Sequence, residues 1–450
     1  MENNHSFADT HFSGGSDAAA DKNFGRLTHY SIRGLFGSFN HTFHLERDEP
    51  TLLTGVNGTG KSTVLRTIEM VSLGNWAELT KIHFDKINLH FENADIEVLG
   101  GENSLTVRMG SKNSEGGEWT FADPKPIPDD DWWVVRNLIT HRRLSDEAME
   151  WAAKNLSHDL TDILHVPANQ ERPGWLNEIP DSFPALLISD RRLTANSRRI
   201  RAKKRGSGET TDVLSAIEAA FANIDDEVQR YRSLYATNSQ KMDRDFPRRV
   251  LSAMRIRESE GEDRWSRAVH RDLMRLDKLQ SGLSATGLVD AAEVEYPLSE
   301  MRMDTEAALP VISTYLKDTI SKLATFEPLR ERLEPFVAFL RRHYRNKEIG
   351  IQDEHLRVKS KLSGEEIPPT HLSSGEQQIL ILAHKVLFET APGTLVMIDE
   401  PELSLHVLWQ STFIDDLTEM SAVTGCQFLL ATHSPTLIAG RNDLRRSLDG

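Results

Sequence analysis

The sequence predicts an α/β fold that carries a large α-helical insertion, on three observations. Apolar runs that pass into helical patterns occur near both ends of the chain, at 51–74 and again at 371–433. Residues 82–121 alternate apolar with polar side chains, which is the period of a half-buried β-strand. Residues 209–345 are rich in Glu, Arg, Leu and Ala at helical spacing. The expected order is therefore a sheet lobe, a helical insertion and a second α/β lobe.

Composition and charge limit the class of protein. A chain of 450 residues exceeds one typical domain, and 38% hydrophobic with 27% charged residues is ordinary for a globular protein. The 68 acidic and 53 basic residues give a net charge of −15, so nucleic acid could be held only by a local basic patch. The single Cys426 indicates a reducing, cytoplasmic compartment. No apolar run of 18 residues is present, and we expect no membrane span.

The elements are predicted in chain order. Residues 1–26 lack the basic and apolar regions of a secretory signal and are expected to form a mobile tail. The N-terminal lobe, 27–208, contains the alternating strands, a helical pattern at 129–156 and a short apolar strand at 183–193. Residues 209–345 form the helical insertion, and 346–450 form the C-terminal lobe. Eight residues interrupt the insertion, so we expect several short packed helices there: Pro247, Gly261, Gly282, Gly287, Pro297, Pro310, Pro328 and Pro335.

The segment "GVNGTGKST", residues 55–63, fits the phosphate-binding loop pattern G-x-x-x-x-G-K-[ST] between a buried strand and a helix. Glycines allow backbone N–H groups to turn towards phosphate oxygens, and the helix N-terminus adds partial positive charge. Lys61 is expected to reach the β- and γ-phosphates, and Ser62 to ligate Mg²⁺. The predicted nucleotide contacts are Asn57, Gly58, Thr59, Gly60, Lys61, Ser62 and Thr63.

The segment "TLVMIDEPELSLH" supplies two carboxylates at the end of an apolar strand. Ligands bind at the carboxyl ends of strands in α/β sheets. Asp399 is therefore a candidate Mg²⁺ ligand, and Glu400 a candidate for polarising the attacking water. The alternative is that both acids only cap the next helix.

The segment "HLSSGEQQILILAHKVL" places a second anion-ready helix N-terminus at Ser373, Ser374, Gly375 and Glu376. One phosphate site already lies in the first loop, so a second such helix implies that two molecules share their nucleotides. The alternative is a plain helix cap.

These motifs, in this order and followed by "ATHS", resemble those of ABC-type ATPases. The resemblance covers residues 27–75 and 365–440. It implies an ATPase head in which ATP and Mg²⁺ lie between two subunits, with Ser373 and Gly375 of one clamping the γ-phosphate held by Lys61 of the other. It also implies that His433 contacts this phosphate, and that ATP is hydrolysed to ADP and phosphate, either rapidly or slowly as an assembly signal.

Two positions depart from the transporter pattern. Glu376 stands where transporters usually carry Gln, and His406 stands where they usually carry Asp. Both variants are similar to the soluble branch that includes OLD nucleases, RecF and SMC-like proteins and phage-defence ATPases. The glutamine that usually bridges Mg²⁺ and water has only Gln170 as a candidate, in what otherwise reads as a loop. Arg192 resembles an arginine of this branch, although a surface salt bridge is the alternative.

A basic stretch, residues 191–205, stands out in an acidic chain. Its candidate contacts to nucleic-acid phosphates are Arg198, Arg199, Arg201, Lys203, Lys204 and Arg205. The alternative is a solvated linker leading into the insertion.

Three functions follow from the resemblance. The first is the ATPase subunit of an anti-phage defence complex, most like the PtuA-type subunits of Septu systems, which assembles as a dimer or larger oligomer. No cluster of His, Asp or Glu with nuclease spacing is evident and the chain ends soon after "ATHSP", so we expect a separate nuclease partner, with the HNH type as a candidate. The alternative is a RecF- or SMC-like repair ATPase that binds DNA. A transporter subunit is disfavoured by Glu376, His406 and the insertion.

Overall fold

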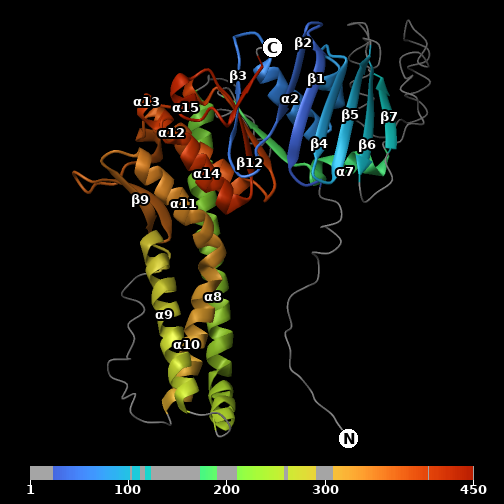
Figure 1. Ribbon diagram of the computed structural model, residues 1–450. Coiled ribbons are helices and arrows are strands. Elements are labelled where there is room, and N and C mark those ends of the chain that lie inside the picture. Colours follow the sequence, from blue (N-terminus) through green and yellow to red (C-terminus); the bar gives the residue numbers. More distant parts are fainter. Residues whose placement is uncertain are drawn as a thin grey trace, which may run out of the picture. The chain divides into compact units, whose positions relative to one another are not determined.

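A computed structural model describes residues 24–101, 104–111, 117–122, 173–189, 210–257, 262–289, 308–403 and 405–448 (Figure 1). The chain divides into two compact units that do not follow chain order. The first unit is Met1–Leu187 with Gly393–Asp399 and Gln427–Gly450, and the second is Ile188–Pro392 with Glu400–Cys426. The expected fold class is confirmed, since the structure combines a mostly parallel sheet, an antiparallel sheet and long helices.

An antiparallel sheet forms one layer of the first unit, with strand order β2-β1-β4-β5-β6-β7. The alternating residues predicted these strands correctly, and polar side chains such as His29, Glu97 and Arg108 line the face away from the core. The strands are β1 Leu27–Leu35, β2 Phe39–His44, β4 Lys86–Phe91, β5 Ala94–Gly101, β6 Ser104–Ser111 and β7 Gly117–Ala122.

A second sheet of the first unit has the order β13-β3-β12-β11-β8. Strands β13, β3, β12 and β11 pair in parallel, so their carboxyl ends share one edge. The strands are β3 Thr51–Thr54, β8 Ala185–Ile188, β11 Leu395–Asp399, β12 Gln427–Ala431 and β13 Arg445–Ser447. The helices of the unit are α2 Lys61–Ser72, α3 Trp76–Leu79, α7 Gly174–Ser182 and α15 Pro435–Ile438.

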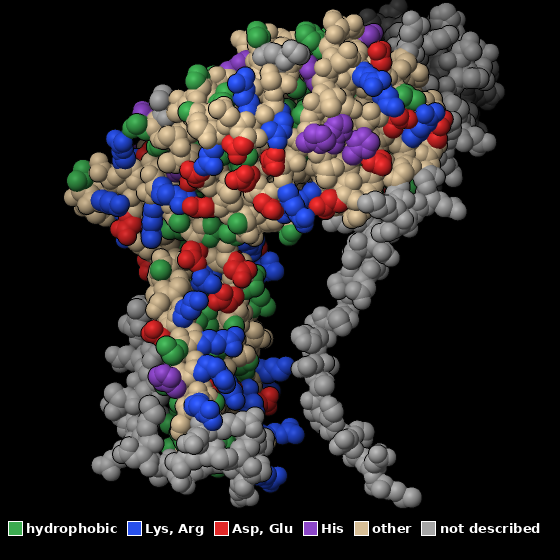
Figure 2. All heavy atoms as spheres, viewed as in Figure 1, with side chains coloured by type: hydrophobic (Ala, Val, Ile, Leu, Met, Phe, Trp, Pro, Cys, Tyr) green, Lys and Arg blue, Asp and Glu red, His purple; other side chains and the backbone are tan. Residues whose placement is uncertain are grey.

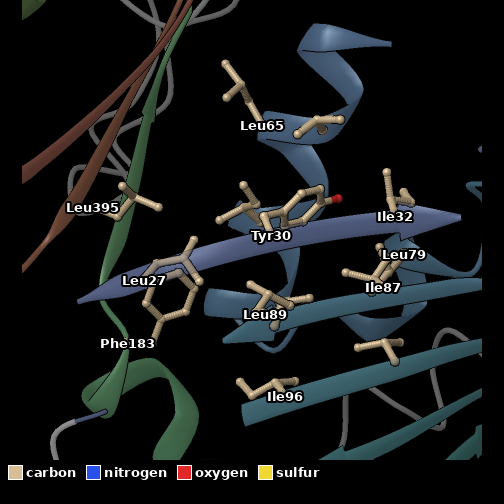
Figure 3. Close-up of a cluster of buried hydrophobic side chains, with 14 of the residues drawn as sticks. Leu27, Tyr30, Ile32, Leu65, Leu79, Ile87, Leu89, Ile96, Phe183 and Leu395 are labelled. Carbon is tan, nitrogen blue, oxygen red and sulfur yellow. The ribbon is translucent and has the colours of Figure 1, made fainter. Parts of the chain in front are cut away.

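The core of the first unit lies between the inner face of the antiparallel sheet and helix α2. Figure 3 shows apolar side chains of β1, β4 and β5 pointing towards Leu65 of α2 and Leu79 of α3, with Phe183 and Leu395 closing the cluster. The buried Tyr30 hydroxyl is hydrogen-bonded to Thr67 of α2 at 2.7 Å, which fixes the helix against β1. Phe24, which we assigned to the N-terminal tail, is also buried in this core, so the ordered lobe begins earlier than expected. Residues 1–23 lie outside the described part.

The second unit contains a long helical arm, made of α8 Thr210–Arg257, α9 Glu262–Thr286 and α10 Leu309–Leu323 (Figure 1). The expectation of only short helices is wrong for α8, which runs unbroken through 48 residues with Pro247 inside it. Proline removes a backbone donor and its ring opens the preceding turn. Here the Arg249 guanidinium donates to the Met242 carbonyl at 2.7 Å and also to Asp318 of α10 at 2.7 Å. The Arg249 guanidinium thus joins the turn before Pro247 to α10, and α8 continues through the proline.

The rest of the second unit packs around helices α11 and α12. Its longer elements are α11 Glu327–His343, β9 Lys347–Gln352, β10 His355–Ser360, α12 Ser374–His384, α13 Val407–Gln410 and α14 Phe413–Thr424. Short 3-10 turns are Ala324–Phe326, Pro369–His371 and Pro401–Leu403, and Lys385–Glu389 is a π-helical turn. The antiparallel β9–β10 hairpin was not predicted. The helix predicted at 129–156 lies outside the described residues.

Candidate nucleotide site

The loop between β3 and α2 has the backbone conformation that its glycines predict. Gly58 and Gly60 have φ angles of 89° and 91°, in the left-handed region that side chains disfavour. A Cβ atom at Gly60 would also lie 2.7 Å from the Leu35 side chain. Because both constraints act on Gly60, the loop can turn into α2 only with glycine at this position.

Lys61 lies within the loop and is only 5% exposed. Its ammonium donates to the carbonyl oxygens of Gly55 at 2.8 Å and Val56 at 3.2 Å, so it ties the first residues of the loop to the start of α2. His41 of β2 supports the loop from outside, with its Nε2 atom 2.7 Å from the Thr59 carbonyl oxygen. Sequence reasoning missed His41, although a histidine between the inward-facing Phe39 and Phe43 of an alternating strand was a usable signal.

Ser62 and Asp399 meet across the carboxyl edge of the parallel sheet. The Ser62 hydroxyl donates to the Asp399 carboxylate at 3.0 Å, although 337 residues separate them in the chain. Magnesium prefers oxygen ligands at about 2.0–2.1 Å in an octahedron, in which neighbouring ligands lie about 3 Å apart. The hydroxyl and carboxylate oxygens therefore fit two adjacent positions of such a shell.

The strand β12 connects the two halves of this site, because it lies between β3 and β11 in the sheet. His433 follows the end of β12 by two residues and is exposed at the same edge of the sheet. The structure thus brings Lys61, Ser62, Asp399 and His433 to the ends of three parallel strands.

Glu400 follows Asp399 directly and has a φ angle of 50°. A left-handed conformation is uncommon for a residue other than glycine and, where it persists, frequently marks a functional position. The Glu400 side chain is half-buried, and its carbonyl accepts a hydrogen bond from Leu403 N–H at 3.1 Å. No sequence pattern indicated this backbone conformation.

The second predicted anion site is the N-terminus of α12, in the second unit. Ser373 is the N-cap and Ser374 is the first helical residue, and both are exposed. Gly375 is half-buried, and the buried Glu376 completes a capping box with Ser373. The capping box that a plain helix cap would have is therefore formed. The Ser373 and Ser374 side chains remain at the surface.

Glu376 is held by charge as well as by the cap. Its carboxylate accepts from the Ser373 N–H at 2.9 Å and from the Ser373 hydroxyl at 2.8 Å, and it is paired with the Lys347 ammonium. Burial acts to raise the pKa of Glu376, but the Lys347 ammonium and the Ser373 hydrogen bonds outweigh it and lower that pKa. The role of Lys347, which lies 29 residues earlier on β9, had no signal in the sequence.

The remaining sequence candidates lie outside the described residues or at another helix. Gln170, Arg192 and the basic stretch lie outside the described residues, and so do its six candidate contacts, Arg198, Arg199, Arg201, Lys203, Lys204 and Arg205. His406 is the N-cap of α13, where its ring accepts from Leu408 N–H at 3.3 Å. No helix in the described part of the chain is long and apolar enough to cross a bilayer.

A glycine loop that ends in a helix, with a hydroxyl–carboxylate pair at the edge of a parallel sheet, defines a P-loop ATPase domain. A model of the family described as "AAA domain, putative AbiEii toxin, Type IV TA system" matches residues 174–439, more than half of the chain. The chain belongs to this family. The match includes α12, β11 and β12, whereas the P-loop precedes it.

Two solved structures of SMC head domains are similar to this chain, at low sequence identity. A structure described as the SmcHead bound to the C-winged helix domain of ScpA has 13% sequence identity and a TM-score of 0.35, with 92% of this chain and 91% of that chain covered. The SMC head domain from Thermotoga maritima has 12% identity and a TM-score of 0.34 at the same coverage. No curated protein matches the chain with significant similarity.

Proposed function

We propose that this chain is the ATP-binding and ATP-hydrolysing subunit of a bacterial anti-phage defence complex in the cytoplasm, where it regulates a separate nuclease. The observation that carries the ATPase part is the 3.0 Å contact between Ser62 and Asp399 beside the P-loop. The defence part is supported by the family description, which names a toxin of a toxin–antitoxin system. Among such complexes, the PtuA-type subunit of Septu, with an HNH nuclease as partner, is our specific proposal.

The proposed chemistry assigns one task to each group. Loop N–H groups from Asn57 to Thr63 and the Lys61 ammonium hold the phosphates of ATP. Ser62 and Asp399 hold Mg²⁺, which when bound offsets the negative charge of the phosphate oxygens. Glu400 orients and polarises the attacking water, and His433 contacts the γ-phosphate.

Two copies complete the site in this proposal. Ser373, Ser374 and Gly375 of a second copy supply an anion-ready helix N-terminus to the γ-phosphate held by the first. The exposed positions of Ser373 and Ser374 support this role, because a second molecule can reach them. ATP then favours the paired state, since only that state makes both sets of contacts.

Two substitutions test the ATPase assignment. Lys61→Ala should abolish ATP binding in calorimetry, because it removes the phosphate-binding cation. Glu400→Gln should retain ATP binding, lose turnover by at least about a hundredfold and accumulate an ATP-bound dimer in light scattering. Glu402→Gln, which removes a carboxylate from the same loop, is the matched control and should hydrolyse ATP at the parental rate. Parental turnover by Glu400→Gln would refute the assigned role.

The partner is tested separately, by native mass spectrometry of the protein purified from its host with ATP present. A second polypeptide in fixed ratio, with nuclease activity, is the expected result. A dimer without any second polypeptide would contradict the regulation of a nuclease but leave the ATPase assignment standing.

A further inference from the structure

The helical arm carries basic side chains on its exposed surface. Figure 2 shows Lys and Arg side chains gathered on the half of the arm that contains the C-terminal part of α8. On this part of α8 the exposed basic residues are Lys241, Arg244, Arg248 and Arg255, and on α9 they form a stripe, which we call the basic arm face, of Arg267, Arg271, Arg275 and Lys278.

Helical spacing places each set on one side of its helix. On α9 the intervals between Arg267, Arg271, Arg275 and Lys278 are four, four and three residues, which align side chains along a helix. At 1.5 Å rise per residue this stripe is about 16 Å long, and the stripe on α8 is about 21 Å. Of the acidic side chains that the structure describes on α9, Asp272 is buried and Asp277 lies on the adjacent face.

The fold of the arm uses other charges. The ion pairs that join α8 to α10 are Arg249 with Asp318 and Asp243 with Lys322, at 2.7 and 2.5 Å. In the part of the chain that the structure describes, Arg271 pairs only with its neighbour Asp272, at 3.9 Å. Arg275 and Lys278 make no ion pair with another described residue. These basic groups are therefore not required to hold the described helices together.

We infer that the basic arm face binds the phosphodiester backbone of nucleic acid. A chain with a net charge of −15 as a whole repels polyanions. A polyanion could therefore bind only at a separate basic surface. Duplex DNA carries one negative charge for about every 1.7 Å of its axis, so a length of 16–21 Å carries roughly ten phosphates on its two strands together. A shallow hollow beside the α9 stripe is lined by Ser266, Arg267, His270, Arg271 and Met274. This lining contains no Phe, Tyr or Trp, which favours contact with the backbone over stacking on bases.

The test measures binding of the full chain to labelled nucleic acid by fluorescence anisotropy over a series of salt concentrations. The triple variant Arg271→Gln, Arg275→Gln, Lys278→Gln should bind a DNA duplex at least about tenfold more weakly, and its salt slope should fall by about one for each lost contact. The matched control replaces the exposed Arg33, Arg345 and Lys361 by Gln, with the same change in charge, and should bind like the parent. Equal weakening in both triple variants, or none in either, would overturn the inference.

Three further measurements separate the alternatives. A variant with Arg271→Lys and Arg275→Lys keeps the charge and should retain the salt slope, which distinguishes lost contacts from an unfolded arm. Duplex and single-stranded DNA and RNA, compared side by side, identify which nucleic acid is preferred. Polyglutamate bound as tightly as any of them would assign the face to an acidic protein and reject the inference. Binding should persist in Lys61→Ala, so failure here and failure of the ATPase proposal are distinguishable.

Discussion

At the scale of single residues, Glu376 places a negative charge beside the hydroxyl that our proposal assigns to a phosphate. The Ser373 hydroxyl donates a hydrogen bond to the Glu376 carboxylate, so it must turn away before it can donate one to an incoming anion. Lys347 offsets the charge without removing the hydrogen bond. The free protein therefore contains its own acceptor at the α12 N-terminus, in competition with the γ-phosphate.

Replacement of this carboxylate gives the first prediction. Glu376→Gln keeps the shape of the capping box and removes the charge, so ATP-driven dimerisation should tighten several-fold, or by about 1 kcal/mol. The same variant leaves Lys347 without its partner and should lower stability by about 1–3 kcal/mol. Light scattering with ATP and urea unfolding measure the two effects. Lys347→Met is the control that loses stability without any gain in dimerisation. A Glu376→Gln variant whose dimer weakens would show that the carboxylate does not compete with phosphate.

At the scale of the element, α8 shows why a proline did not divide the arm. The sequence shows that Pro247 cannot donate to the Asp243 carbonyl, but not that Arg249 will bind the Met242 carbonyl of the preceding turn and pair with Asp318. Burial raises the pKa of Asp318, and the attraction of Arg249 and Lys322 offsets this only in part. One guanidinium thus links the continuity of α8 to its packing on α10.

This linkage predicts a double-mutant result. Arg249→Met should destabilise the second unit by about 1–3 kcal/mol, because it leaves the Met242 carbonyl and the Asp318 carboxylate without this donor. Pro247→Ala should recover part of the loss, since alanine restores the N–H that donates to the Asp243 carbonyl and so strengthens the same turn of α8. Urea unfolding followed by circular dichroism gives both values. If the two substitutions simply add, Arg249 does not act through the proline turn.

At the scale of the whole molecule, local patterns predicted the elements better than their arrangement. Alternation identified β4 to β7, and motif spacing identified the residues at the ends of β3, β11 and β12. The order of strands was not predictable, since no pattern in residues 427–431 indicates that this strand pairs with both β3 and β11. His41 and Lys347 escaped prediction for the same reason, because their roles depend on contacts between separate segments.

The two units should respond to acid at different pH values. Burial and the neighbouring His44 and His90 lower the pKa of His29 below 6.5, so the unfolded chain takes up this proton first as pH falls. The first unit should therefore lose stability below pH 6.5. The pKa of Glu376 is lowered from 4.5, so its contribution to the second unit is lost only below pH 4.5. Between pH 6.5 and pH 4.5, calorimetry should show the unfolding transition of the first unit moving more than that of the second. His29→Asn should reduce that movement. Equal movement of both transitions would contradict this assignment.

The place of β12 between β3 and β11 sets an order of events during synthesis. The ribosome delivers the P-loop early and Asp399 late, but the strand that joins them comes later still. Leu395, Met397 and Leu429 belong to the core beside the antiparallel sheet, so this core also is completed only when the late strands have been made. Translation interrupted before residue 399 therefore leaves fragments in which Ser62 has no Asp399 carboxylate to contact.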